Sequence, residues 1–277
     1  EPTYVALPLE LPGHAKGMSG FLLEHMCGTR AAADGWQQEY SSFLKSIGFV
    51  QGVASPCIFV QNEKNISTSV HGDDFTSVGA KCDLDWLETL MEAKYELRKG
   101  GRLGPGKDDA KEILVLNRVI RYTEHGLEYE ADPRHAEKIV ASMDIQEGKS
   151  AVTAGATPAK NSEAEQKEDE EKMGPSEASN FRSLSARANY LAADRPDMQF
   201  AFKECAKAMS NPSFVDLPKM KRLARYFTDK PRLQHTFDFG MSAENIQAQS
   251  DSDWAGDRVT RKSISGGVIR LGSHLIK

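Results

Sequence analysis

Two adjacent aspartates could bind a metal ion. The stretch SVHGDDFTS (69–77) places Asp73 and Asp74 directly after Gly72, between two segments whose alternating pattern predicts β-strands. Neighbouring carboxylates at such a turn can present oxygen ligands to a hard cation such as Mg²⁺. Phosphoryl and nucleotidyl transfer use carboxylates that hold two divalent cations. Glycine and aspartate are also common turn residues, so these residues alone leave an ordinary hairpin turn as the alternative.

A second acidic pair lies near the end of the sequence. Asp251 and Asp253 alternate along a predicted strand and therefore share one face of it. One of these carboxylates would suit a second metal site, while a solvated edge strand carrying charge explains the pair equally simply. The seven histidines show no metal-ligand spacing, and GRLGPG (101–106) lacks the lysine and the strand-to-helix context of a phosphate loop.

Composition and charge restrict the class of protein. The 277 residues are 39% hydrophobic and 27% charged, which is typical of a globular chain, and no apolar run approaches the roughly 18 residues of a membrane helix. The N-terminus lacks a signal-peptide pattern, so we expect an intracellular protein that is not secreted. The four cysteines lack CxxC spacing, which argues against zinc or disulfides.

The net charge of −5 is unevenly distributed. Residues 161–178 hold seven acids and two lysines, whereas 201–235 hold eight lysines and arginines and three acids. A local basic face is therefore possible on an acidic chain.

Hydrophobic periodicity predicts the elements that must position these residues. In the first half we expect a helix capped by Asp34 and stopped by Gly48, a strand meander that includes 57–61 and 66–70, and a helix over 83–98. The first of these helices carries aromatic and apolar residues at helical spacing, which predicts a core-facing stripe: Trp36, Tyr40, Phe43, Leu44 and Ile47. A hairpin around His125 and Gly126 and a short helix over 133–143 should follow. The Pro- and Gly-rich opening predicts a loop or edge segment.

The second half begins with a polar, acidic stretch, for which we expect a mobile linker over 146–178. Three helices separated by DRP, SNP and DKPR should follow, and then two strands within 245–257 and 265–272.

Five segments, taken in order, resemble the reverse transcriptase of copia-type (Ty1/copia) retrotransposons. MCGTRAAADGWQQEYSSFLKSIGF resembles the family's LYGLKQAPRAWY…L…GF, and SPCIFV with VHGDDF resembles D…LF…YVDD. FRSLSARANYLAADRPDMQFAFKECAKAMSNPS resembles YRSLVGSLLYL…RPDI…V…LS…MSNP, and KRLARYF resembles KRILRYL. SDSDWAGDRVTRKSISGG resembles SDSDWAGD…RKSTSG, the opening of the family's ribonuclease H domain.

The resemblance implies an α+β fold: a partial right-hand polymerase palm with a helical thumb and connection, followed by the first strands of a ribonuclease H-like domain. The implied domains are an N-terminally truncated palm with the start of the thumb (1–145), an acidic disordered linker (146–178), the helical thumb and connection (179–240), and a C-terminally truncated start of ribonuclease H (241–277).

The resemblance also implies roles for individual residues. Asp73, Asp74 and Asp251 would be catalytic and would bind Mg²⁺, with Asp251 matching the first ribonuclease H carboxylate. Gly28, Arg30 and Gly72 would contact nucleotide or template, and Arg222 and Arg225 would lie near phosphates. The implied partners are an RNA/DNA primer-template and dNTPs, with no membrane; the oligomeric state stays open, and the compartment could be a cytoplasmic particle or the nucleus.

Three departures from the family pattern lead to two hypotheses. His71 and Gly72 replace the family's tyrosine and hydrophobic residue, another palm aspartate is expected upstream of residue 1, and the other ribonuclease H acids are expected beyond Lys277. The first hypothesis is an RNA-directed DNA polymerase region, with this fragment itself inactive. The alternative is a non-catalytic retroelement remnant that binds nucleic acid or protein.

Overall fold

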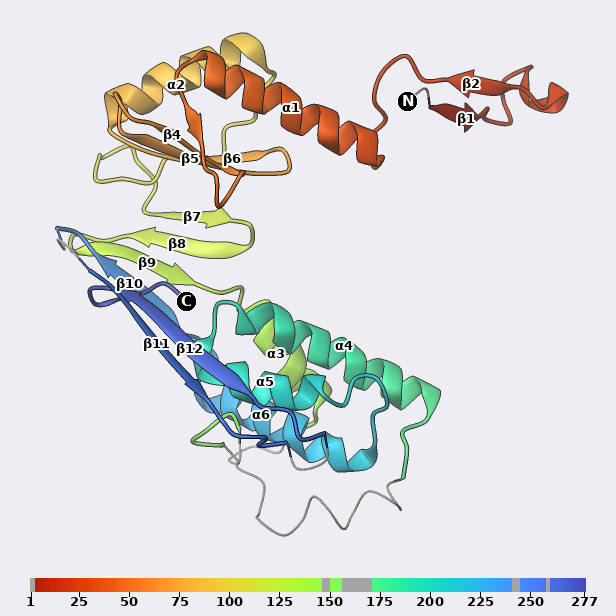
Figure 1. Ribbon diagram of the computed structural model, residues 1–277, viewed down its shortest axis with the longest axis vertical. Coiled ribbons are helices and arrows are strands. Elements are labelled where there is room, and N and C mark those ends of the chain that lie inside the picture. The colour runs from red at the N-terminus through yellow and green to blue at the C-terminus, as the bar shows by residue number, and fades with distance from the viewer. Residues whose placement is uncertain (1–2, 146–149, 156–170, 241–244, 258–259) are drawn as a thin grey trace. The chain divides into compact units, whose positions relative to one another are not determined.

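The computed structural model describes residues 3–145, 150–155, 171–240, 245–257 and 260–277. The chain divides into two compact units, Glu1–Lys99 and Gly100–Lys277, which can be followed separately in Figure 1. Both units combine helices with antiparallel sheets, in agreement with the predicted α+β class. Among the helices within the described ranges, none combines the length and the hydropathy that a membrane span requires.

The first unit contains a four-stranded antiparallel sheet with the order β3-β4-β5-β6. Its strands are β3 (Val50–Gln51), β4 (Ile58–Gln61), β5 (Ile66–His71) and β6 (Asp74–Val78). Along β5, Ile66, Thr68 and Val70 are buried and the residues between them are exposed, because successive side chains of a strand leave opposite faces. The predicted meander is therefore confirmed.

Two helices cover the buried face of this sheet. Figure 1 shows α1 (Arg30–Ser46) and α2 (Lys81–Lys94) on one side of β4 to β6. Their apolar residues share one core with those of the sheet, including Leu44 and Phe59, which are both fully buried. The core helix predicted from aromatic spacing is thus confirmed, and the predicted helix over 83–98 runs instead over 81–94.

The start of α1 corrects the sequence-based prediction. The helix begins four residues before Asp34, and Thr29 is its N-cap, with its side-chain oxygen accepting a 3.2 Å hydrogen bond from the backbone N–H of Ala32. Asp34 lies on the exposed surface inside the helix. The end was predicted correctly, because Gly48 adopts a φ of +89° just beyond the C-cap.

The opening segment forms a small hairpin. Strand β1 (Tyr4–Ala6) pairs antiparallel with β2 (Ser19–Phe21), and the 3₁₀ turn η1 (His14–Lys16) lies between them. Sequence alone predicted a loop or edge segment here, because proline and glycine obscure so short a strand pattern.

The second unit contains a four-stranded antiparallel sheet with the order β10-β9-β8-β7. Its strands are β7 (Glu112–Val115), β8 (Arg118–Tyr122), β9 (Gly126–Glu130) and β10 (Gln234–Asp238). The hairpin predicted around Gly126 is confirmed as the β8–β9 turn. The segment before it turns once more at Leu116 and Asn117, both with positive φ. Strand β10 was not predicted, since its partner β9 lies about a hundred residues earlier in the chain.

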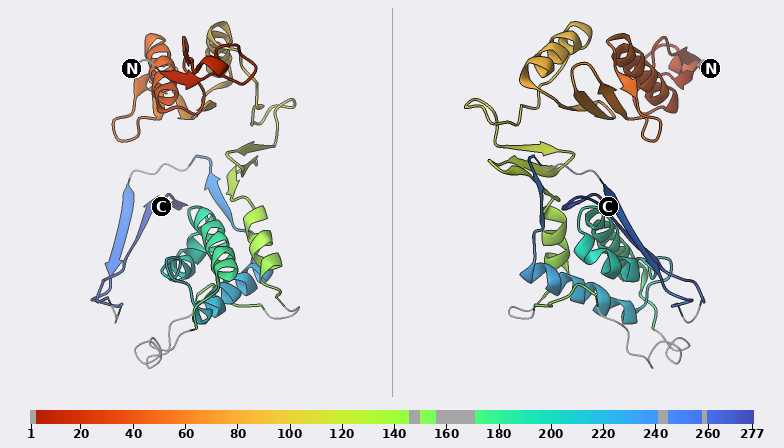
Figure 2. Two further views of the ribbon diagram at one scale, coloured as in Figure 1. Left: turned by 90° about the vertical axis from the view of Figure 1, so that its right-hand side faces the viewer. Right: turned by 60° about the vertical axis from the view of Figure 1, so that its left-hand side comes forward.

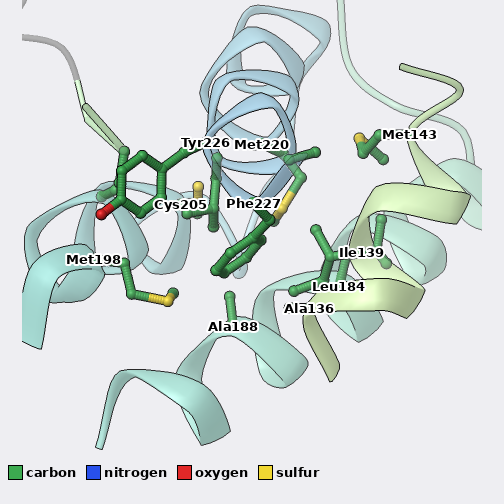
Figure 3. Close-up of a cluster of buried hydrophobic side chains, with 14 of the residues drawn as sticks. Ala136, Ile139, Met143, Leu184, Ala188, Met198, Cys205, Met220, Tyr226 and Phe227 are labelled. Atoms are coloured by element: carbon green, nitrogen blue, oxygen red, sulfur yellow. The ribbon is translucent and has the colours of Figure 1, made fainter. Parts of the chain in front are cut away.

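Four helices form the core of the second unit. They are α3 (Arg134–Ser142), α4 (Pro175–Ala192), α5 (Gln199–Ala206) and α6 (Leu217–Asp229), with short 3₁₀ turns η2 (Pro196–Met198) and η3 (Phe214–Asp216) before α5 and α6. Figure 2 shows this bundle from two further sides. Figure 3 shows Phe227 of α6 directed toward Ala188 of α4, with Ile139 of α3 beside it. The predicted helices are confirmed: α3 and α5 are shorter than predicted, whereas α4 begins earlier, at Pro175, and α6 extends to Asp229.

The predicted mobile linker, 146–178, is structured in part. Residues 146–149 and 156–170 lie outside the described residues. Ala151 and Ala154 are buried in the helical core, and the N–H of Met173 donates to the carbonyl of Pro212 at 3.2 Å. Helix α4 begins already at Pro175. Both described parts are therefore attached to the bundle through buried apolar residues and hydrogen bonds, which charge and composition did not show.

The last strands form a three-stranded sheet with the order β11-β12-β13. They are β11 (Ile246–Ser252), β12 (Ser265–Leu271) and β13 (His274–Leu275). Every residue of β11 is exposed. The two predicted strands are confirmed, with β11 ending before Asp253.

Candidate metal-binding turn

The two adjacent aspartates lie at a two-residue turn between β5 and β6. His71 and Asp74 form the last pair of the ladder, so Gly72 and Asp73 are the central residues of the turn. Gly72 has a φ of +64°, and Asp73 is not among the residues with positive φ. This is the pattern of a type II′ hairpin turn, which requires glycine at its first central position. A Cβ at Gly72 would meet no atom within 4 Å, so conformation rather than space requires glycine there.

The turn is attached to α1 through a tryptophan. The indole Nε1–H of Trp36 donates a 2.8 Å hydrogen bond to the carbonyl oxygen of Gly72. The indole ring makes edge contacts with Tyr40, Phe75 and Tyr95, at centroid distances of 5.7, 6.3 and 5.4 Å. Sequence reasoning placed Trp36 in a core-facing stripe and missed this contact, because the partner is a backbone atom 36 residues away.

The carboxylates of Asp73 and Asp74 are both available to a ligand. Both residues are exposed, and no hydrogen bond or ion pair within the described residues engages either side chain. Asp74 and His71 lie on the exposed side of the sheet, whereas Val70 and Phe75, the next ladder pair, lie on the side of the core. The turn therefore presents uncommitted acids at the surface.

The donor set is small but suits a hard cation. Over the part of the chain that is described, no three His, Cys, Asp or Glu side chains converge on a metal-binding point. Mg²⁺ commonly binds one or two protein carboxylates and completes its octahedral shell with waters and substrate phosphates. Asp73 and Asp74 can supply that number of carboxylates, so these residues fit Mg²⁺ only as part of a site that substrate or further residues complete.

Gly28 and Arg30 lie at the start of α1, in the same unit as the turn. Gly28 has a φ of +88° and immediately precedes the N-cap, while Arg30 is the first helical residue and is exposed. Six residues separate Arg30 from Trp36, which corresponds to about 9 Å along a helix axis. The first unit therefore brings five predicted site residues onto two connected elements: Gly28, Arg30, Gly72, Asp73 and Asp74.

Arg222 and Arg225 lie in the second unit, on α6. The Nε–H of Arg222 donates to the carbonyl of Gly155 at 3.0 Å, and its Nη2 donates to Oγ1 of Thr153 at 2.8 Å. The N–H of Ala151 donates to the carbonyl of Arg225 at 3.3 Å. Both arginines thus attach residues 151–155 to the helix, Arg222 through its side chain. Their predicted proximity to phosphates stays a prediction.

Most cations of the basic stretch 201–235 already have acidic partners. Ion pairs are formed by Lys203 and Lys207 with Glu204, by Lys219 with Asp216, by Lys230 with Asp229 and by Arg232 with Glu130. Of the basic residues on α6, Lys221, Arg222 and Arg225 have no carboxylate within 4.0 Å among the described residues. The basic face inferred from composition is therefore largely neutralised within the unit.

Asp251 and Asp253 have different surroundings. Oδ1 of Asp253 accepts hydrogen bonds from the backbone N–H of Ile264 at 2.7 Å and of Gly256 at 3.3 Å, so this side chain holds the loop after β11. Asp251 lies within β11 opposite Gly266 and is exposed. Asp251 is therefore the available carboxylate of the pair.

Several carboxylates of the second unit have displaced pKa values. Hydrogen bonds from Arg232 foremost, and from Arg121, lower the pKa of Glu130 against the opposing effect of burial. Burial would raise the pKa of Asp197, but hydrogen bonds from Arg195 and Tyr226 outweigh it and lower that pKa. Both carboxylates form ion pairs with arginines of the same unit, and these pairs have a structural role.

Comparison with known proteins finds relatives along most of the chain. It is 26% identical over 259 residues to the retrovirus-related Pol polyprotein from transposon RE1 of Arabidopsis thaliana, covering 92% of this chain and 16% of that protein. It is 25% identical over 268 residues to that from transposon TNT 1-94 of Nicotiana tabacum, covering 92% and 19%. An uncharacterized mitochondrial protein of Arabidopsis thaliana is 35% identical over 99 residues, covering 35% and 40%.

The chain thus spans less than a fifth of the length of these Pol polyproteins and 40% of the mitochondrial protein. No family model matches the chain, and no solved structure matches it at a significant level.

Proposed function

We propose that the chain is a reverse transcriptase region of a retrotransposon Pol polyprotein. The premise is that the homologues of this chain are retrovirus-related Pol polyproteins of copia-type transposons. One observation carries the proposal: the acids that match the family's aspartate pair, Asp73 and Asp74, occupy a tight hairpin turn with uncommitted carboxylates. An ordinary turn needs only one of them, and aspartates with a purely structural task are engaged by hydrogen bonds, as Asp253 is.

Each part of the chain has a task in this proposal. The first unit supplies most of the palm, and the helices between 179 and 240 supply the thumb and connection. Residues 241–277 begin a ribonuclease H-like domain, with Asp251 as its first acid. Gly28 and Arg30 contact nucleotide or template, and Arg225, which has no carboxylate within 4.0 Å among the described residues, contacts a backbone phosphate.

The chemistry follows from the acids. Asp73 and Asp74 would hold Mg²⁺, and the ion when bound would supply charge stabilisation for nucleotidyl transfer. The task of the two aspartates is to orient that ion, and the β5–β6 ladder places both of them at the same end of the sheet. Gly72 leaves the surface open beside the acids, since even an added Cβ would meet no atom within 4 Å.

A second candidate function is binding of nucleic acid or protein without catalysis. The observation that favours it is the small donor set: the described residues bring two adjacent carboxylates together and no third metal-binding side chain. Primer extension separates the two candidates.

The experiment measures DNA synthesis on a primed RNA template with Mg²⁺. It compares this chain, a polypeptide lengthened at its N-terminus with the sequence that precedes it in its gene, and the longer polypeptide carrying Asp73→Asn. Asp34→Asn is the matched control, because Asp34 is an exposed aspartate of the same unit that belongs to α1 and not to the turn. We expect activity in the longer polypeptide and in the control, and a loss of at least a hundredfold with Asp73→Asn.

Two results would contradict the proposal. A folded longer polypeptide without synthesis would favour the non-catalytic function. Synthesis that survives Asp73→Asn unchanged would show that the acids of the turn do not carry the reaction.

A further inference from the structure

The hairpin turn that carries Asp73 has one soft degree of freedom. Type I′ and type II′ turns both have positive φ at their first central residue, but φ at the second is positive in type I′ and negative in type II′. Conversion of one type into the other rotates the peptide unit between the two central residues, which here joins Gly72 to Asp73. Glycine accepts the first position of both types, and aspartate tolerates positive φ better than most residues. The ladder alone therefore does not select one type.

The carbonyl of this same peptide unit receives the indole N–H of Trp36. The bond length is 2.8 Å, and the observed turn has the negative φ of type II′ at Asp73. Rotation of the peptide unit would turn the carbonyl of Gly72 away from the indole and break the bond. Trp36 thus stabilises one of the two orientations of the Gly72–Asp73 peptide unit. The direction in which the side chain of Asp73 projects depends on that orientation.

The donor itself is held rigidly. Trp36 lies in the middle of α1 and makes edge contacts with Tyr40 and Tyr95. Tyr40 is only 7% exposed and contacts Phe59 and Phe75 of the sheet. The indole therefore links the turn to the core of the unit, rather than following the turn when it moves.

We propose that Trp36 is a positioning residue that fixes the orientation of Asp73 for metal binding by holding the Gly72–Asp73 peptide unit in one of its two orientations. Its metal-binding consequence rests on the proposed function, whereas the conformational effect on the turn does not. A net hydrogen bond of ordinary strength changes a two-state population by about three- to tenfold. Loss of the indole donor should therefore weaken metal binding at the turn by about that factor.

The first test uses this chain and follows the turn directly. Backbone NMR shifts of Gly72 and Asp73 are compared in wild type, Trp36→Phe and Trp86→Phe. Trp86 is the matched control, because it packs against the same core and its indole has no hydrogen bond to the turn. We expect Trp36→Phe to move both shifts toward an average of the two turn types and Trp86→Phe to leave them unchanged. Unchanged shifts in a folded Trp36→Phe protein would overturn the inference.

A second variant separates loss of the N–H donor from loss of ring packing. Site-specific replacement of Trp36 by benzothienylalanine keeps the bicyclic ring and removes the N–H. We expect this variant to keep the wild-type melting temperature within a few degrees and to show the same averaged shifts as Trp36→Phe. If the shifts are averaged in Trp36→Phe and not in the benzothienylalanine variant, the effect comes from lost packing, and the inference is overturned.

Mn²⁺ titration in the presence of a dNTP, whose phosphates would complete the site, then measures metal binding through paramagnetic broadening of the Asp73 and Asp74 amide signals. We expect about three- to tenfold weaker binding when the indole donor is absent, and wild-type binding in Trp86→Phe. Equal binding in all variants would refute the metal-positioning role. Absence of broadening in wild type would instead count against the proposed function, while the shift comparison still decides the conformational effect.

In the lengthened polypeptide the same variants are assayed for primer extension. A positioning role predicts a loss in kcat that is largest at low Mg²⁺ and recovers as Mg²⁺ is raised, with the KM for primer-template unchanged. A loss that Mg²⁺ does not relieve would indicate general destabilisation and contradict the proposal.

Discussion

Arg195 allows a quantitative test of what the Arg-Pro-Asp segment does in this protein. The residue is 2% exposed, and its guanidinium donates to Oδ1 and Oδ2 of Asp197 at 2.9 and 2.8 Å. It also donates to the carbonyls of Lys230 and Pro231 at 3.0 and 3.2 Å. These two carbonyls directly follow α6, where helix geometry leaves acceptors without intrahelical donors. Arg195 therefore joins the start of α5 to the end of α6.

Replacing Arg195 with methionine removes the charge and keeps an apolar side chain of similar reach. Asp197 keeps one partner, the Tyr226 hydroxyl at 2.6 Å, while both carbonyls lose their donor. Removing one member of a buried ion pair costs about 3–5 kcal/mol. The side chain of Asp197 is 22% exposed, so water compensates part of its loss, and we expect about 3 kcal/mol, at the lower end of that range. At about 1.36 kcal/mol per tenfold, opening of the unit becomes roughly 150-fold more frequent.

The thiol of Cys205 reports this opening. Its side chain is fully buried in the helical core (Figure 3), and burial raises its pKa to about 12, so it reacts only when the core opens. In a background where the exposed cysteines 27, 57 and 82 are replaced by serine, the labelling rate of Cys205 with a thiol reagent should rise by roughly 150-fold with Arg195→Met.

Arg182→Met is the control for this experiment. Arg182 is an exposed arginine of α4 whose Nε–H donates to the carbonyl of Met209 at 2.7 Å. Because water can replace this donor, we expect a change of less than about fivefold. An Arg195→Met effect as small as that of the control, with helix content intact, would refute the idea that the buried guanidinium stabilises the unit.

Three further predictions follow from local features. The pKa of Glu130 lies below the ordinary value of 4.5, so the ionised side chain contributes fully to stability above pH 4.5 and loses this contribution as the pH falls through the lower folded-state pKa. Glu130→Gln should therefore flatten the dependence of the Cys205 labelling rate on acid pH. A variant with the same slope as wild type would contradict this. Leu116 has a φ of +50°, so Leu116→Asn should stabilise the protein by about 1 kcal/mol, read as a higher melting temperature; no gain would mean that the turn is unstrained. Thr29→Ala should lose about 1 kcal/mol of helix capping, which is measured as faster hydrogen exchange in the first turn of α1. Asp34→Ala changes the cap position that the sequence suggested and should leave this exchange rate unchanged. Equal effects of the two variants would reject the observed helix start.

Local patterns carried much of the fold. The aromatic and leucine spacing of α1, the alternation along β5 and the proline-containing breaks between α4, α5 and α6 were sufficient to predict those elements, because each depends on residues within one or two turns of one another. The position of Asp73 and Asp74 at a strand-to-strand turn was predicted on the same grounds and is confirmed. Their role as metal ligands stays a prediction.

Contacts between distant residues were beyond the reach of sequence. Strand β10 pairs with β9 across about a hundred residues, and nothing in QHTFD distinguishes a strand partner from a loop. The family resemblance places Arg222 near phosphates, which stays a prediction, and the structure adds that its side chain donates to the Oγ1 of Thr153 and the carbonyl of Gly155. A charge in a sequence does not show whether the fold already supplies its partner.

By itself, the sequence determined which residues could do chemistry: a glycine and two aspartates at a turn, recognisable because turn geometry and carboxylate chemistry are local properties. Only the tertiary structure decided that neither acid is engaged by another described residue, and that the indole of Trp36 donates a hydrogen bond to the carbonyl of Gly72. The physical reason is that a hydrogen bond to a backbone carbonyl depends on where a helix packs against a sheet, and no side-chain pattern near the acceptor records it.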